Sequence, residues 1–172
     1  MRALVVIIAA AFMAAVSHAA TINVPGDYPI IQEAIAVAVD GDIIEVEAGT
    51  YWGAIDFQAK AITIVSVDGP EVTIINGKGE SPVVRIVQAG FDGATISGFT
   101  ITGGWGDVGG GVYVSGVCGA TSQATITDCI IENNDAELGA GMYITGGCAC
   151  YASAINLSNC IIRNNTSGSG IH

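Results

Sequence analysis

Two segments in the second half of the chain recur about every 30 residues, and this repeat constrains the fold more than any other feature. The copies of the first segment are Thr95–Gly104, Thr125–Asn134 and Asn156–Asn165. The copies of the second segment, which is rich in glycine, are Gly109–Tyr113, Gly139–Tyr143 and Gly168–His172. Because both segments share one period, we expect each repeat to be a structural unit that stacks on the next.

The residues inside each repeat follow the two-residue periodicity of β-strands. Apolar positions lie two apart, as at Cys129 and Ile131, and no helical stripe competes with this pattern. Residues that tolerate a left-handed backbone interrupt the strands, and Asp128 and Asn159 occupy one such corner. Three short strands per repeat, broken at these corners, indicate one coil of a β-solenoid.

Stacked coils lie about 4.8 Å apart, so equivalent residues form ladders along the solenoid axis. The alignment predicts a core ladder of Phe99, Cys129 and Cys160, an exposed ion pair between Glu132 and Arg163, and polar turn ladders of Asn133 with Asn164 and Asn134 with Asn165.

The first half of the chain is less regular but also contains several strand patterns. These patterns cover Asp42–Glu47, Lys60–Ile64, Val72–Asn76 and Val83–Val87. Ahead of them, Pro29–Val39 carries apolar residues at helical spacing and ends at Asp40–Gly41, a typical helix stop. We expect this helix to cap the open end of the solenoid and to block the addition of further strands.

The amino terminus has the features of a secretory signal peptide. Arg2 gives a positive start, Leu4–Val16 form a short apolar run, and Ser17–Ala19 offer a small-residue cleavage site. The alternative is a membrane anchor, but this run is shorter than the roughly 20 residues that span a bilayer. We therefore expect a signal peptide over 1–20, a mature domain over 21–172 without a transmembrane segment, and a secreted or cell-surface location.

The charge balance excludes one class of partner. The chain has 16 Asp and Glu against 5 Lys and Arg, a formal net charge of −11, and no basic stripe. This charge repels phosphate backbones, so a nucleic acid is not an expected partner, whereas polysaccharides and cell-surface glycans are compatible.

The segments Thr21–Ile35, Asp40–Asp42 and Ala48–Tyr51 resemble the amino-terminal cap and first coil of pectate-lyase-like proteins. Pectin methylesterases begin similarly, and the later repeats are similar to those of bacterial right-handed β-helix proteins and, more loosely, of chlamydial polymorphic outer-membrane proteins. The resemblance implies an all-β fold, a right-handed parallel β-helix with a short amino-terminal capping helix. The last segment, Gly168–His172, begins another coil, so we expect the β-helix to be truncated at its carboxyl end.

This scaffold hosts both enzymes and binding proteins, so function depends on the site residues. Arg85 and Arg163 are the only arginines after the signal, and neither lies in an acidic cluster in the sequence, so no complete catalytic set is visible. The sequence favours a non-enzymatic secreted or cell-surface protein in glycan binding, adhesion or surface architecture. The alternative is the amino-terminal part of a polysaccharide-active lyase, hydrolase or esterase.

Aromatic residues mark the first candidate site. Tyr113 and Tyr143 are in register on the glycine-rich strands, and Trp105 lies nearby. Sugar rings stack on exposed aromatic faces, which would make these three residues a glycan platform. The alternative is cross-strand pairing that only stabilises the sheet.

Carboxylates mark the second candidate site. Asp107 and Glu137 are equivalent in the repeat, and Asp135 is close to Glu137, at a loop edge before the glycine-rich strands. Ca²⁺ takes six to eight oxygen ligands, so these carboxylates are candidates for a calcium site. The alternative is a solvated acidic edge.

The chain has 5 cysteines, so at least one has no internal disulfide partner. Cys118 and Cys148 share a loop position, and Cys150 is two residues further on. We expect Cys118 to be linked to Cys148 or Cys150. Cys129 and Cys160 are expected to stay free in the core, where free cysteine is a small hydrophobe.

Overall fold

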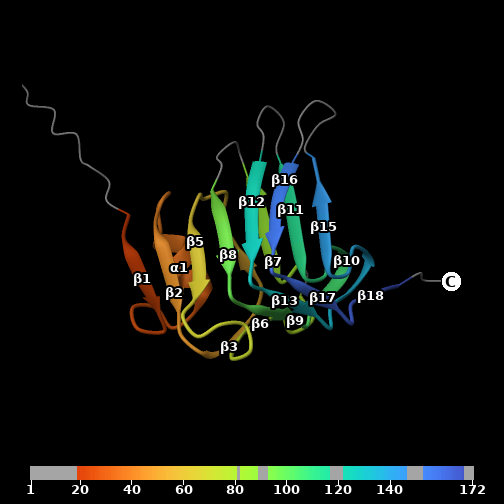
Figure 1. Cartoon of the computed structure of the whole chain (residues 1–172), viewed down its shortest axis with the longest axis horizontal. Helices are drawn as coiled ribbons and strands as arrows, with labels where there is room; N and C mark the ends of the chain where they lie inside the picture. Colours follow the sequence, from red (N-terminus) through yellow and green to blue (C-terminus); the bar gives the residue numbers. More distant parts are fainter. Residues whose placement is uncertain (1–18, 81, 89–92, 117–121, 147–152, 169–172) are drawn as a thin grey trace, which may run out of the picture.

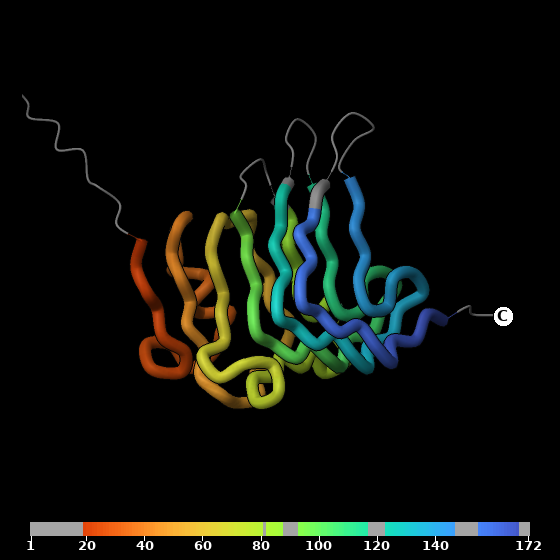
Figure 2. The backbone as a smooth tube through the Cα atoms, in the orientation of Figure 1, coloured from red at the N-terminus to blue at the C-terminus, as the bar shows by residue number. Residues whose placement is uncertain are grey.

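The structure, a computed structural model, describes residues 19–80, 82–88, 93–116, 122–146 and 153–168. Figure 2 shows the described chain winding into coils that stand side by side along the long axis of the molecule, from the N-terminal coil to the C-terminal one. All strand pairings in these ranges are parallel. The predicted β-solenoid is therefore confirmed.

Two of the four sheets form the longest faces of the solenoid (Figure 1). Sheet A runs in the order β1 (Thr21–Val24), β2 (Ile43–Val46), β5 (Thr63–Ser66), β8 (Ala94–Ser97), β12 (Ser122–Thr127) and β16 (Ser153–Ser158). Sheet B runs in the order β3 (Gly49–Trp52), β6 (Thr73–Asn76), β9 (Thr100–Thr102), β13 (Ile130–Glu132) and β17 (Ile161–Arg163).

The other two sheets are shorter and carry the residues of the candidate sites. Sheet C consists of β4 (Ile55–Asp56), β7 (Val84–Gln88), β11 (Val112–Gly116) and β15 (Met142–Thr145). Sheet D consists of β10 (Trp105–Val108), β14 (Asp135–Leu138) and β18 (Thr166–Ser167). The later coils thus have a fourth strand, and the prediction of three per repeat was wrong for them, because the strands of sheet D are only two to four residues long and contain few apolar residues.

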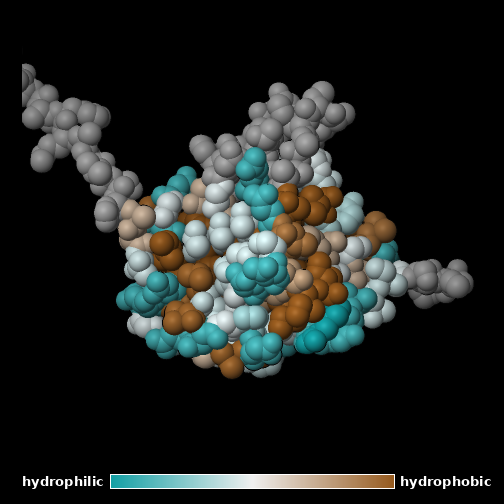
Figure 3. All heavy atoms as spheres, in the orientation of Figure 1, coloured by the Kyte–Doolittle hydropathy of each residue, from teal (hydrophilic) through white to brown (hydrophobic). Residues whose placement is uncertain are grey.

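The core consists of ladders of apolar side chains inside the coils. One ladder contains Ile44, Ile64, Ile96 and Ile126, which are in register in sheet A and fully buried. At the next position Leu157 is 45% exposed, because β16 is the last described strand of this sheet. Figure 3 shows hydrophobic surface over β16 and β17 at this end of the solenoid.

The predicted ladders around the core are confirmed. Phe99 and Cys129 are buried, and Cys160 is partly buried against the core. On the outer face, Arg163 Nε donates to Glu132 Oε2 at 2.6 Å. The corner residues Asp128 and Asn159, with φ of 54° and 52°, are joined by a hydrogen bond from Asn159 Nδ2 to Asp128 Oδ1.

The predicted capping helix is α1 (Ile31–Val37), shorter than the expected range of 29–39. It packs against β1, β2 and β4 at the N-terminal end of the solenoid. The side-chain amide of Gln32 accepts a hydrogen bond from Asp56 N at 2.7 Å and donates one to Asp56 O at 3.2 Å. This side chain thus takes the place of a neighbouring strand at the edge of sheet C, as expected of a cap.

None of the helices in the described ranges has both the length and the apolar character needed to cross a membrane.

Candidate functional site

Four polar and aromatic side chains form one column on the outer face of sheet C. Arg85 is paired with Asp56 on one neighbouring strand and with Tyr113 on the other, and Tyr113 is paired with Tyr143. The two tyrosine rings are stacked, with centroids 6.0 Å apart and planes inclined by 13°. The sequence prediction of a tyrosine ladder is therefore confirmed in its geometry.

The alternation of the strands turns these rings outwards. Val112 and Val114, on either side of Tyr113, are fully buried, while Tyr113 and Tyr143 are half-buried. In β15 the inward residue Ile144 is 42% exposed, since no described strand follows β15 in sheet C. The column is thus anchored by buried neighbours in β11 and is open to solvent on its outer side.

Glycines bring sheets C and D close together at this column. Gly109 has φ of +64°, and a Cβ there would lie 3.1 Å from Tyr113 Cβ. A Cβ on Gly111 would lie 2.5 Å from Gly141 O of the next coil. The glycine-rich segment is therefore required both for the left-handed turn and for the tight stacking of successive turns.

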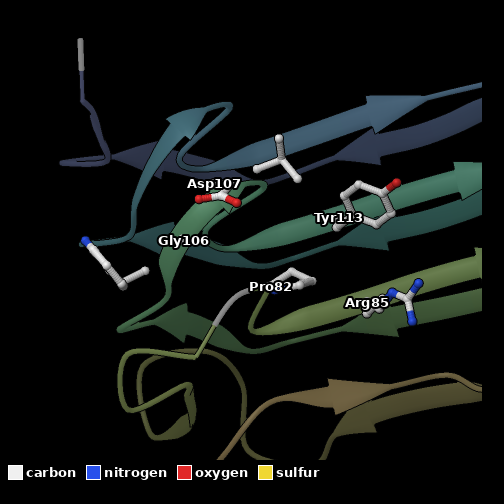
Figure 4. Close-up of a pocket in the computed structure, with 7 residues that line it drawn as sticks. Pro82, Arg85, Gly106, Asp107 and Tyr113 are labelled. Atoms are coloured by element: carbon white, nitrogen blue, oxygen red, sulfur yellow. The ribbon is translucent and has the colours of Figure 1, made fainter. Parts of the chain in front are cut away.

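A surface cavity of about 430 Å³ lies where sheet D meets this column. Arg85 and Tyr113 line it from sheet C, and Asp107 lines it from β10 together with Trp105. Figure 4 shows Arg85 and Tyr113 on neighbouring strands, both projecting from the outer face, with Asp107 and Pro82 beside them. Trp105 is 67% exposed, so it extends the apolar wall of the cavity into solvent.

A second cavity of about 600 Å³ adjoins the first along β10. The two share Trp105, Gly106 and Asp107, and the second is also lined by Asp135 and Glu137. These carboxylates lie in strands β10 and β14 and not in the loop that the sequence suggested. Together the two cavities form one groove around β10, which we call the sheet C/D groove.

The carboxylates of the groove are those for which the sequence predicted a calcium site. Within the described ranges, no group of three or more His, Cys, Asp or Glu side chains is placed to hold a metal ion. The calcium site at Asp107, Asp135 and Glu137 gains no support from this arrangement and stays a prediction.

The charges at the column are balanced by a local ion pair. Arg85 Nη1 donates to Asp56 Oδ2 at 3.1 Å, and both side chains are partly exposed, at 49% and 39%. Such an exposed pair contributes little stability, but it leaves guanidinium N–H groups available to a ligand while its charge is compensated. Arg85 donors, Asp107 acceptors and aromatic rings together match the hydroxyl groups and C–H faces of a sugar.

The comparisons with known proteins agree with this architecture. The model of the family described as "Right handed beta helix region" matches residues 55–172, more than half of the chain. The chain belongs to this family. No curated protein and no solved structure matches the chain in the other two comparisons. The family sets the fold of this β-helix protein but not its function, which depends on the residues of its sites.

Arg85 is the groove residue that sequence reasoning missed. The sequence shows no acidic cluster near it, yet the β-helix brings Asp56 and Asp107 from other coils to its side. The sequence does contain a pattern that points to Arg85: Val84–Ile86 has the same apolar, polar, apolar order as Val112–Val114. In the structure the two triplets are in register. Only the register of the coils shows that both triplets belong to one column.

The cysteines of the β-helix divide into two groups. Cys129 and Cys160 are free, as predicted, and their thiols donate to the carbonyls of Thr127 and Ser158. Burial raises the pKa of the Cys129 thiol to about 12, so it is neutral and unreactive at physiological pH. The proposed linkage of Cys118 to Cys148 or Cys150 lies outside the described residues.

Proposed function

We propose that this protein is exported and binds a neutral glycan in the sheet C/D groove, with no catalytic role of its own. The observation that carries the proposal is the stacked pair of Tyr113 and Tyr143, in register with Arg85 and next to Asp107. Aromatic surface and a few polar groups on one open groove are the usual elements of a sugar site.

The groove also suits an extended glycan in its dimensions. Tyr113 and Tyr143 belong to consecutive coils, whose strands are about 4.8 Å apart. Successive sugar units that run along the solenoid axis would therefore meet equivalent side chains on successive coils. An open groove of this kind binds a polymer along its length, in keeping with a protein that contributes to adhesion or surface architecture.

Binding to a glycan array before and after substitution of both tyrosines tests the proposal. We expect Tyr113→Ser with Tyr143→Ser to weaken binding by a few-fold to tenfold per ring, because each sugar-stacking contact is worth on the order of 1 kcal/mol. The matched variant, Tyr113→Phe with Tyr143→Phe, keeps both rings and should retain most of the affinity. Thermal unfolding should change little in either variant.

Two results would contradict the proposal. Unchanged binding in the double serine variant would show that the ladder only stabilises the sheet. The substitution Val114→Ser, which disrupts the buried core, sets the scale for a structural effect. An equally large fall in the unfolding temperature of the double serine variant would also show that the ladder only stabilises the sheet.

The presence of Arg85 and Asp107 in one cavity favours a second candidate function, the cleavage of a polysaccharide. The bound glycan should be incubated with the protein and its chain length followed by mass spectrometry. Shortening of the glycan by the parent protein but not by Asp107→Asn would show that the groove is catalytic and does not only bind.

A further inference from the structure

A buried carboxylate holds the first described residues of the chain in place. Asp42 is only 4% exposed, and it accepts hydrogen bonds from Ala20 N at 2.9 Å and from Val39 N at 2.8 Å. Ile43 N also donates to Ala20 O at 2.9 Å. Ala20 is thus bound through both its backbone nitrogen and its carbonyl at the start of sheet A.

The same residue adjoins the expected signal-peptide cleavage site. Cutting after Ala19 places the small residues Ser17 and Ala19 at the third and first positions before the cut, as signal peptidases require. Cutting after Ala20 would instead place His18 at the third position. It would also remove both hydrogen bonds of Ala20 and leave the buried Asp42 carboxylate with one acceptor site unpaired.

We infer that export processing hydrolyses the Ala19–Ala20 peptide bond and that the new α-ammonium group of Ala20 forms an ion pair with the buried Asp42 carboxylate. The reaction consumes one water molecule. Its oxygen joins the Ala19 carbonyl carbon to form the carboxylate of the released peptide, and its two hydrogens convert the Ala20 amide nitrogen to an ammonium group.

The surroundings of Asp42 favour this ion pair. Its backbone hydrogen bonds from Val39 and Ala20, and to a lesser extent the charge of Lys60, lower the pKa of the carboxyl, so it is ionised at neutral pH. Lys60 does not occupy the carboxylate, because its Nζ donates to the carbonyls of Ile35 and Ala36. The neighbouring Asp40 accepts from Ala61 N. A charged donor in place of an amide therefore strengthens a contact that already exists.

Two measurements on the protein test the inference. The full chain should be exported and the amino terminus of the mature product determined by mass spectrometry, which we expect to find Ala20. Separately, a mature chain that starts at Ala20 should be compared with one that carries a single extra glycine before Ala20. The extra glycine keeps the amide hydrogen bond but moves the ammonium group away, so we expect its unfolding temperature to be lower by about 2 to 4 °C.

The Asp42→Asn substitution supplies the control. With Asp42→Asn in both chains, the chain that starts at Ala20 and the chain with the extra glycine should unfold at the same temperature. The ammonium group that distinguishes them then has no carboxylate to pair with. An exported product that starts elsewhere, or equal unfolding temperatures of the two termini when Asp42 is intact, would overturn the inference. The comparison of termini does not require the Asp42→Asn variant to fold.

Discussion

Adjacent asparagines at one corner of the coil have opposite structural roles. Asn133 is exposed and has φ of 55°, a left-handed conformation that turns the chain. Asn134 is 1% exposed, and its side chain accepts from Gly104 N and donates to Ile101 O. Asn165 repeats this arrangement one coil further on, with a hydrogen bond from its Nδ2 to Ile131 O. The inner asparagines thus satisfy buried backbone groups where the strands of sheet B end.

Replacing Asn134 with alanine should lower the free energy of unfolding by about 2 to 4 kcal/mol, since Gly104 N–H and Ile101 C=O lose their partner inside the solenoid. Urea unfolding measures this loss. The matched variant, Asn133→Gly, keeps the left-handed turn and should stay within about 1 kcal/mol of the parent. Equal effects of the two substitutions would contradict the division of roles.

For single residues, the sequence predicted which side chains form ladders but not which of them point into the core. Two neighbouring asparagines recur at each corner, so a polar turn ladder could be predicted for both. The second asparagine of each pair points inwards because the first one has a left-handed backbone conformation. Since the two residues are identical, the sequence does not show which of them is left-handed. Arg85 is a similar case, because its partners come from other coils.

At the scale of elements, sheet D was missed and sheets A to C were largely predicted. The strands of sheets A to C contain alternating apolar residues that fill the core, and this alternation is visible in the sequence. In β14, by contrast, the alternation covers only four residues, Asp-Ala-Glu-Leu, and of its two apolar side chains Ala136 is buried while Leu138 is exposed, so the pattern is too short to predict a strand. These strands form because equivalent backbone segments of successive coils lie close enough to pair.

The cap on sheet C leads to a prediction for the edge strand β4. Gln32→Leu should lower the free energy of unfolding by about 1 to 2 kcal/mol, because two hydrogen bonds to the backbone of Asp56 are lost at a partly buried edge. Gln32→Glu keeps the acceptor for Asp56 N and should lose about half as much. Urea unfolding of both variants measures the effect, and an unchanged midpoint in Gln32→Leu would show that the helix caps the sheet by packing alone.

For the whole molecule, the Lys and Arg side chains in the described ranges all have partners within the protein. Arg85 and Arg163 are in ion pairs, and Lys60 binds carbonyls at the end of α1. Lys78 lies over the ring of Trp52, with its Nζ 5.0 Å from the ring centroid. With a formal net charge of −11, the surface therefore offers an anionic ligand little compensation for its charge.

This charge distribution predicts that the groove prefers neutral glycans to acidic ones. Neutral hexose oligomers should bind more tightly at low salt than hexuronic acid oligomers of the same linkage. The difference should shrink as NaCl rises from 0.01 M to 1 M, since the Debye length falls from about 30 Å to about 3 Å. Isothermal titration calorimetry with paired oligomers measures the ratio of the two affinities.

Two variants with equal charge separate a local effect from that of the net charge. Asp107→Asn with Glu137→Gln removes two carboxylates from the groove, whereas Glu33→Gln with Glu71→Gln removes two exposed carboxylates elsewhere. The groove variant should lower the preference for neutral oligomers several-fold, because repulsion at contact distance is screened less than repulsion across the molecule. The distant variant should change it much less. The parent protein could instead bind the acidic oligomer more tightly, in a way that still depends on Tyr113 and Tyr143. That result would contradict the preference for neutral glycans but not the glycan site itself.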